Sequence, residues 1–209
     1  MGRLSRKWSP IKGKAKVLVL ASGGGTTFEA LVKEAQANNY SYEVVGLVTN
    51  SKKSGCQERA ERLDVPAFFV QYSPKYPEEF FEDVTELCEE LEVEVIALAG
   101  FLLLLREPLL TKYSGKILNT HPSLLPKFGG KGLYGDRVHQ AVLDAGESES
   151  GVTIHEVNER YDEGQILGVK KVKVLKGDSV ETLSERVRSE ERSFYPLVLN
   201  QFVTSLGFG

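Results

Sequence analysis

The chain has 209 residues, of which 41% are hydrophobic and 26% are charged, and its net charge is −3. This length can bury the core of one domain or two small lobes. A mildly acidic chain lacks the clustered Lys and Arg of sequence-independent nucleic-acid binders, so we expect no nucleic-acid partner. Cys56 and Cys88 are too few for a disulfide framework or a zinc cluster and favour a reducing cytoplasm.

The first residues are rich in Lys and Arg, and no acidic residue precedes Glu29. A basic segment before an apolar run can also begin a secretory signal. The apolar run at residues 17–21 is shorter than the core of a signal peptide and leads into glycines. We therefore expect residues 1–14 to be a solvated basic tail. No segment approaches the roughly 20 apolar residues of a membrane helix, so we expect no membrane partner.

Near-continuous hydrophobic runs recur through the first half of the chain and predict parallel strands covered on both faces. They lie at residues 16–21, 43–49, 67–70 and 93–99. Helical patterns fill the intervals, at residues 27–38, 56–63 and 77–91. The third helix is rich in acidic residues, which we expect to form a solvated face and not a catalytic pair. The alternation predicts a doubly wound, mostly parallel, Rossmann-like α/β sheet with helices on both faces.

The second half continues this pattern with a strand at residues 116–119, a loop rich in Gly and Lys at 127–135 and a helix at 136–145. Two further strands, 151–157 and 165–174, would flank a turn at 158–164. A long amphipathic helix, 179–206, would close the chain, with an interruption near Pro196. We expect a single domain, residues 15–209.

A glycine-rich turn from Ser22 to Thr27 follows the first strand and opens a helix. Glycines let backbone N–H groups approach a phosphate, and a helix N-terminus adds its positive end. Thr26 or Thr27 could cap the helix or give a hydroxyl to the anion. The turn is neither a P-loop nor a dinucleotide fingerprint, because it lacks G-K-[ST] and has Phe28 where a third glycine would stand. It is either a site for a monophosphate or simply a tight turn.

Asn119 and His121 end the strand in the segment KILNTHPSLLP, residues 116–126. Residues i and i+2 of an extended segment share a face, so the two side chains can converge on one ligand. Open α/β sheets bind ligands at this end of their strands. An amide donor beside an imidazole suits acyl chemistry. The alternative is a strand terminus with a hydrogen-bonded histidine.

The other candidates are weaker on their own. His139 and His155 would lie on a helix and a strand, and a structural role is the simpler interpretation for each, although His155 can approach the site. Asp162 lies in a segment where Asp usually shapes a turn. It gains interest if it faces His121, because a carboxylate would then raise the imidazole pKa and fix the ring's orientation.

Four segments carry these features: SGGGTTF (22–28), ALAGF (97–101), NTHPSLLP (119–126) and GVTIHEVNERYDEGQIL (151–167). Together they resemble the formyltransferase family that uses 10-formyltetrahydrofolate, and most of all its short members, the glycinamide ribonucleotide formyltransferases of purine synthesis. The resemblance covers the chain from residue 16 onward. It implies a catalytic triad of Asn119, His121 and Asp162, because the family's Asp follows a strand histidine by seven residues, as Asp162 follows His155.

The resemblance also implies a mechanism, in which the amine of glycinamide ribonucleotide attacks the formyl carbon of the folate cosubstrate without a metal. Asn119 and protonated His121 would stabilise the charge on the formyl oxygen. Asp162 would orient and charge His121 and relay a proton through water.

The binding residues would divide between the two substrates. The resemblance places the substrate phosphate on the backbone of Gly24, Gly25, Thr26 and Thr27, helped by Arg188, and the ribose hydroxyls on Glu191. It places the pterin ring against the backbone of Leu102, Leu103, Leu104 and Leu105 and against the loop from Val157 to Asp162. We expect most of these leucines to be core. Residues 15–115 would then be a phosphate-binding half and residues 116–209 a catalytic and folate-binding half.

Three departures from the family pattern stand out. Thr27 replaces a common Asn, Leu102 and Leu103 replace a common Met-Arg, and residues 128–139 form a longer loop than usual. Lys131 in that loop could add a positive charge near either substrate.

Other members of the family are alternatives. Methionyl-tRNA formyltransferase has a further C-terminal domain and a basic surface, and formyltetrahydrofolate deformylase has an N-terminal regulatory domain. We expect this chain to be neither of these two enzymes. A formyltransferase for another phosphate-bearing amine, such as an amino sugar, stays open, as does a non-catalytic folate or nucleotide-binding module. The chain is expected to be a monomer or a homodimer.

Overall fold

Seven strands pair into one sheet in the order β3-β2-β1-β4-β5-β6-β7. They are β1 (Ala15–Leu20), β2 (Tyr42–Thr49), β3 (Ala67–Phe69), β4 (Val95–Leu98), β5 (Ile117–His121), β6 (Glu149–Glu156) and β7 (Ile166–Lys173). The helices are α1 (Thr26–Ala37), α2 (Gly55–Arg62), α3 (Pro77–Glu90), α4 (Leu109–Lys112), α5 (Asp136–Asp144) and α6 (Val180–Ser205). This computed structural model describes residues 13–209, so nearly all of the predicted basic tail lies outside the described residues.

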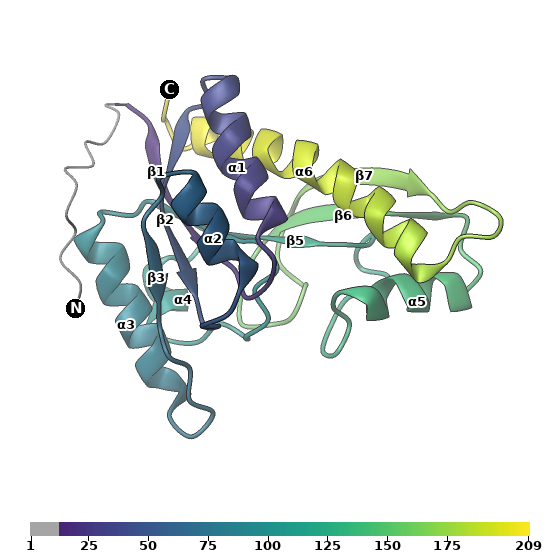
Figure 1. Ribbon diagram of the computed structural model, residues 1–209, viewed down its shortest axis with the longest axis horizontal. Helices are drawn as coiled ribbons and strands as arrows, with labels where there is room; N and C mark the ends of the chain where they lie inside the picture. The colour runs from purple at the N-terminus through teal and green to yellow at the C-terminus, as the bar shows by residue number, and fades with distance from the viewer. Residues whose placement is uncertain (1–12) are drawn as a thin grey trace.

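The first five strands run parallel, and β6 and β7 are antiparallel to their neighbours. Side chains of β1 alternate between two cores: Val17 and Val19 pack with α1, α2 and α6, whereas Leu18 and Leu20 pack with α3 and α4. Figure 1 shows these two helical layers around the sheet. A strand that is apolar on both faces needs such cover, so the predicted doubly wound fold is confirmed.

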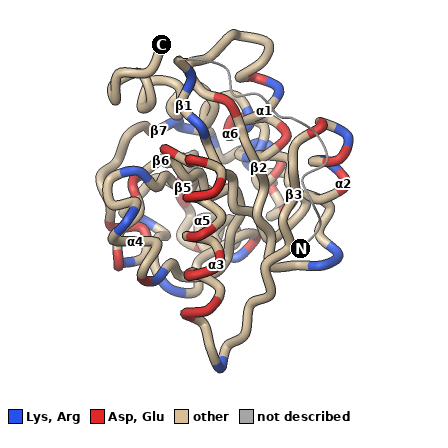
Figure 2. Tube along the Cα trace, turned by 90° about the vertical axis from the view of Figure 1, so that its left-hand side faces the viewer, with Lys and Arg blue, Asp and Glu red and all other residues tan. Residues whose placement is uncertain are grey.

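The acidic residues of α3 face outward. Its buried side is apolar and includes Phe80, Phe81 and Val84. All of its Asp and Glu side chains are exposed, and Figure 2 shows them as red positions along the helix. The predicted solvated face is therefore confirmed.

β5 is longer than predicted, because it reaches His121 instead of ending at Asn119. Its pairing with β4 stops at Asn119, but its pairing with β6 continues, with Thr120 opposite Ile154 and His121 opposite Thr153. The antiparallel partner thus holds His121 in extended backbone beyond the edge of the parallel sheet.

The predicted interruption of the last helix is wrong. α6 runs unbroken from Val180 to Ser205 with Pro196 inside it. Proline removes one backbone hydrogen bond from a helix. Here Pro196 is buried, and Tyr195, Val198 and Leu199 beside it belong to the same core, so packing on both sides keeps the helix continuous.

The described part of the chain contains no helix that is both long enough and apolar enough to span a bilayer. The boundary between the two predicted halves, at residues 115 and 116, falls between β4 and β5, and these two strands pair directly with each other. The division into a phosphate-binding and a catalytic half stays a prediction about function.

Candidate active site

A cavity of about 660 Å³ opens at the carboxyl ends of β1, β4 and β5. The strand order reverses here. From β1 the chain first adds β2 and β3 on one side, and it then crosses over to add β4 and β5 on the other side. Such a switch point leaves a crevice between the loops. All of the residues predicted for catalysis or for binding either substrate line this one cavity.

Asp162 and His121 meet in the cavity although 41 residues separate them in the sequence. The Nδ1 atom of His121 lies 3.4 Å from Oδ2 of Asp162. The same Oδ2 atom accepts a 2.8 Å hydrogen bond from the N–H of Gly130. His121 is only 4% exposed, so this pair is shielded from bulk water.

His155 also belongs to this cluster. It lies opposite Asn119 in the β5–β6 register, and its Nδ1–H donates to the Glu156 carbonyl at 2.7 Å. Its Nε2 atom is 3.2 Å from Nδ2 of Asn119 and 3.5 Å from Oδ1 of Asp162. Nε2 can accept from the amide or, when it carries a proton, donate to the carboxylate. His155 therefore does lie next to the proposed triad, a position that the sequence had left open.

The protonation of His121 differs from our expectation. Its Nε2 atom is 2.8 Å from the Phe128 carbonyl, which can only accept, so Nε2 carries a proton. Burial lowers the pKa of His121 and outweighs the opposing effect of the Asp162 charge. The Asp162 carboxylate thus raises this pKa as predicted, but the net change is downward because desolvation of the imidazolium dominates.

Asp162 is held as a carboxylate. Burial by itself would raise the pKa of its side chain. The contact with His155, the nearby imidazole of His121 and the N–H of Gly130 together lower that pKa below its ordinary value. At neutral pH the group is thus an anion with two imidazoles in reach.

The residues after His121 form a turn that is anchored to β6. Thr153 donates to the Ser123 carbonyl at 2.6 Å and accepts from the Leu125 N–H at 3.1 Å. The Ser123 hydroxyl donates to the Lys127 carbonyl at 2.8 Å. These bonds explain Ser123, the polar residue of the segment PSLLP, and position the loop that carries Phe128 and Gly130.

Gly25, and not Thr26 or Thr27, is the N-cap of α1. It has a left-handed backbone with φ of 78°, and no side chain caps the helix. The first turn of α1 therefore offers its N–H groups and the positive end of its dipole to the cavity. The guanidinium of Arg59 on α2 stabilises the turn by donating a 2.7 Å hydrogen bond to the Gly24 carbonyl.

Thr27 gives its hydroxyl to a carboxylate and not to the cavity, because it donates to Oε1 of Glu191 at 3.0 Å. Glu191 is buried, and burial raises the pKa of its carboxyl group. Arg188 lines the cavity from the same helix and pairs with Asp136 at 3.2 Å. Arg192, which sequence reasoning missed, lines it as well, one helical turn beyond Arg188.

The leucine run is more exposed than predicted. Leu105 is core, but Leu103 and Leu104 are half-buried and Leu102 is 58% exposed. The expectation that most of them are core is wrong, because the chain leaves β4 here and forms one wall of the cavity. The N–H of Leu102 donates to the Ser22 hydroxyl at 3.3 Å, which ties this wall to the glycine-rich turn.

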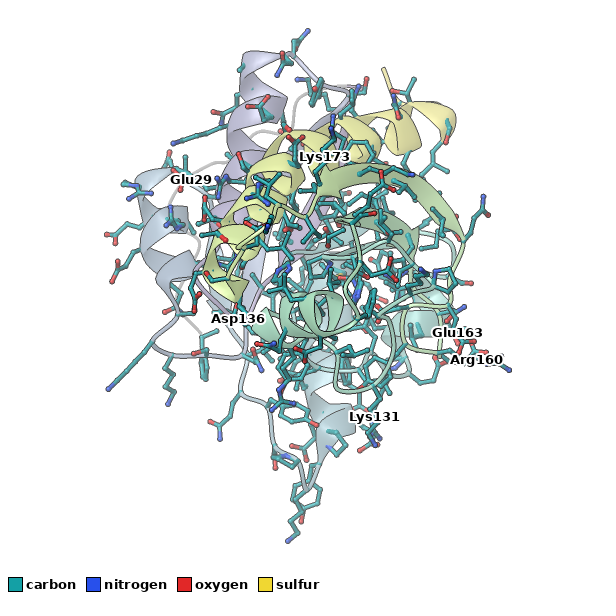
Figure 3. All side chains as sticks on the ribbon, turned by 90° about the vertical axis from the view of Figure 1, so that its right-hand side faces the viewer. Glu29, Lys131, Asp136, Arg160, Glu163 and Lys173 are labelled. Atoms are coloured by element: carbon teal, nitrogen blue, oxygen red, sulfur yellow. The ribbon has the colours of Figure 1, made fainter. Side chains whose placement is uncertain are left out.

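Of two basic residues on the loops near the cavity, Arg160 lines it and Lys131 does not. Lys131 is exposed and is not part of the cavity lining. Arg160 contributes to the lining, and its guanidinium pairs with Glu163 at 3.3 Å. Figure 3 shows Arg160 and Glu163 together at the surface, apart from Asp136.

The sequence pattern of the formyl transferase family matches residues 15–199. The chain belongs to this family. It is 38% identical to phosphoribosylglycinamide formyltransferase of Bacillus subtilis (strain 168), over 90% of the chain and 94% of that protein. It is 39% identical to the chloroplastic phosphoribosylglycinamide formyltransferase of Arabidopsis thaliana, over 87% of the chain and 63% of that protein.

Solved structures give the same picture. The crystal structure of phosphoribosylglycinamide formyltransferase from Brucella melitensis superposes with a TM-score of 0.82 at 36% identity, over 90% of the chain and 95% of that structure. The formyltransferase fold predicted from the sequence is therefore confirmed.

Proposed function

We propose that this protein transfers the formyl group of 10-formyltetrahydrofolate to the primary amine of glycinamide ribonucleotide in purine biosynthesis. The observation that carries the proposal is the convergence of Asn119, His121 and Asp162 in one cavity with an uncapped, glycine-rich helix start. The family relatives of similar length support it, since they are named for this reaction.

The amine would attack the formyl carbon to form a C–N bond and a tetrahedral intermediate. Charge would then grow on the formyl oxygen, where the Asn119 amide and the Nε2–H of His121 can donate. The Phe128 carbonyl now accepts from that Nε2–H, so the oxygen of the substrate would compete with it. Neutral His121 can act in this way, because it keeps the proton on Nε2.

Asp162 would take the proton that the attacking amine loses, directly or through one water. Its lowered pKa keeps the carboxylate ready to accept at neutral pH. Collapse of the intermediate breaks the bond from the formyl carbon to the folate nitrogen. That nitrogen leaves with a proton, which the Asp162 cluster can return, so the folate product is tetrahydrofolate.

The two ends of the cavity suit different ligands. The start of α1, from Gly24 to Thr27, would hold the phosphate with Arg188 alongside, and Glu191 would accept from the ribose hydroxyls. The apolar wall of Leu102 to Leu105 and the facing Val157 would hold the flat pterin ring. No metal is required by this chemistry, and a cytoplasmic monomer or homodimer remains our prediction.

A direct spectrophotometric assay with both substrates tests the proposal. The protein is mixed with 10-formyltetrahydrofolate and glycinamide ribonucleotide, and the absorbance of the folate product is followed. We expect turnover that requires both compounds. Tight binding of both without turnover would favour a non-catalytic module, and turnover only with a nucleotide-linked amino sugar would favour the alternative acceptor.

A further inference from the structure

His139 is a buried histidine whose ring is left without full hydrogen bonding. It lies on α5 and is 1% exposed. Its Nδ1 atom is buried and has no hydrogen-bond partner within residues 13–209. Buried polar atoms without a partner are rare, because each loses its bonds to water and gains nothing in return. The simple structural role expected for His139 therefore does not account for it.

The surroundings of His139 point to a ligand. The residue lines the same cavity as the triad. It lies close enough to the charged side chains of Arg188 and Asp136, and to the His121 imidazole, for each of them to influence its pKa. Asp136 pairs with Arg188 at 3.2 Å, and Figure 3 places Asp136 at the α5 end that faces α6. His139 thus shares the cavity with Arg188, at the end we assign to the phosphate, and with His121 of the proposed triad.

Its charge state narrows the kind of ligand. Burial, aided by the nearby charge of Arg188, lowers the pKa of His139 to about 4, so the ring is neutral at neutral pH. A neutral imidazole carries one N–H donor and one acceptor nitrogen, which suits an amide and gives no preference for a phosphate. The folate wall is built from other elements, the leucine run and Val157.

We infer that His139 binds the acceptor substrate, through a hydrogen bond to the glycyl amide that links the ribose phosphate to the reactive amine. This inference rests on the proposed function. It makes His139 a specificity residue for the length and polarity of the acceptor's arm. Its unpaired nitrogen is then a binding feature that only the substrate completes.

Two substitutions test this role. His139→Leu removes both nitrogens, and His139→Asn keeps an amide near the position of Nδ1. We expect the KM for glycinamide ribonucleotide to rise roughly five- to tenfold in His139→Leu and to change less in His139→Asn. The KM for the folate should stay within about twofold of the wild-type value in both. The melting temperature of His139→Leu should be unchanged or higher, because a buried unpaired atom is lost.

Ser150→Ala supplies the matched control. The Ser150 hydroxyl on β6 is also buried and has no hydrogen-bond partner in the described part of the chain, but the residue does not line the cavity. We expect the same tolerance in melting temperature and no change in either KM. An unchanged KM for glycinamide ribonucleotide in His139→Leu would overturn the inference, as would equal changes for both substrates. A wild-type protein inactive on glycinamide ribonucleotide would instead refute the proposed function, a result visible before any variant is made.

Discussion

At the scale of single residues, one carboxylate organises the chemistry. The two oxygens of Asp162 face His121 at 3.4 Å and His155 at 3.5 Å, and the N–H of Gly130 fixes one of them. The backbone at Asp162 is left-handed, with φ of 57°. Asp tolerates this conformation better than most residues, so a turn former and a catalytic group can be the same residue.

Asp162→Asn should lower kcat by on the order of 10²–10⁴, because the amide keeps the shape of the side chain but cannot take a proton. Steady-state rates with both substrates measure this effect, and circular dichroism checks that the fold is retained. Glu163→Gln is the control: Glu163 is exposed and pairs only with Arg160 among the described contacts, so its rate should match the wild type. Near-normal turnover in Asp162→Asn would refute the catalytic role assigned to Asp162.

At the scale of elements, the start of α1 depends on close packing against α2. A methyl group at Gly25 would come within 2.5 Å of the Cβ atom of Cys56, and the backbone there has φ of 78°. The same turn is held by Arg59 from α2, which also pairs with Glu29 of α1. The glycine is thus required by both its conformation and its neighbour.

We predict that Gly25→Ala destabilises the protein by about 2 kcal/mol or more, since it combines an overlap with a strained backbone. The KM for the phosphate-bearing substrate should rise as the turn shifts. Thermal unfolding and substrate titration measure the two effects. Gly23→Ala has open space around the new methyl group and should melt like the wild type. A wild-type melting temperature for Gly25→Ala would contradict the packing argument.

At the scale of the whole molecule, stability should depend on pH through buried histidines. The pKa of His139 is about 4 in the folded protein, against an ordinary value of 6.5. Between these values the unfolded chain binds more protons than the folded one, so stability falls as pH falls. Burial lowers the pKa of His121 in the same sense, while the raised pKa of Glu191 acts in the opposite sense.

The contribution of His139 can be isolated by comparing the wild type with His139→Leu. At pH 5 the wild type should have lost about 2 kcal/mol of stability through this group relative to pH 7.5. The Leu variant should lose that much less over the same range. Urea unfolding at a series of pH values measures the difference. Parallel pH profiles for the two proteins would show that His139 does not titrate as its burial requires.

Local patterns in the chain already specify much of this protein. Apolar runs alternating with helical periodicity predict the doubly wound sheet, because each element must bury its own apolar side. The spacing of Asn119 and His121 predicts their common face, since strand geometry is local. The glycine turn and the leucine run line one cavity, because the carboxyl ends of parallel strands share an edge of the sheet.

Packing between distant segments decided the rest. Desolvation sets the charge of His121, and the amount of burial depends on the loop that brings the Phe128 carbonyl onto the ring. Pairing with β6 lengthens β5 and brings in His155, and the core around Pro196 keeps α6 whole. The packing of α5 beside the cavity buries the Nδ1 atom of His139, which has no hydrogen-bond partner among residues 13–209. Periodicity reports what one segment needs to bury, whereas pKa values, hydrogen-bond partners and unmet polar groups depend on which other segments arrive.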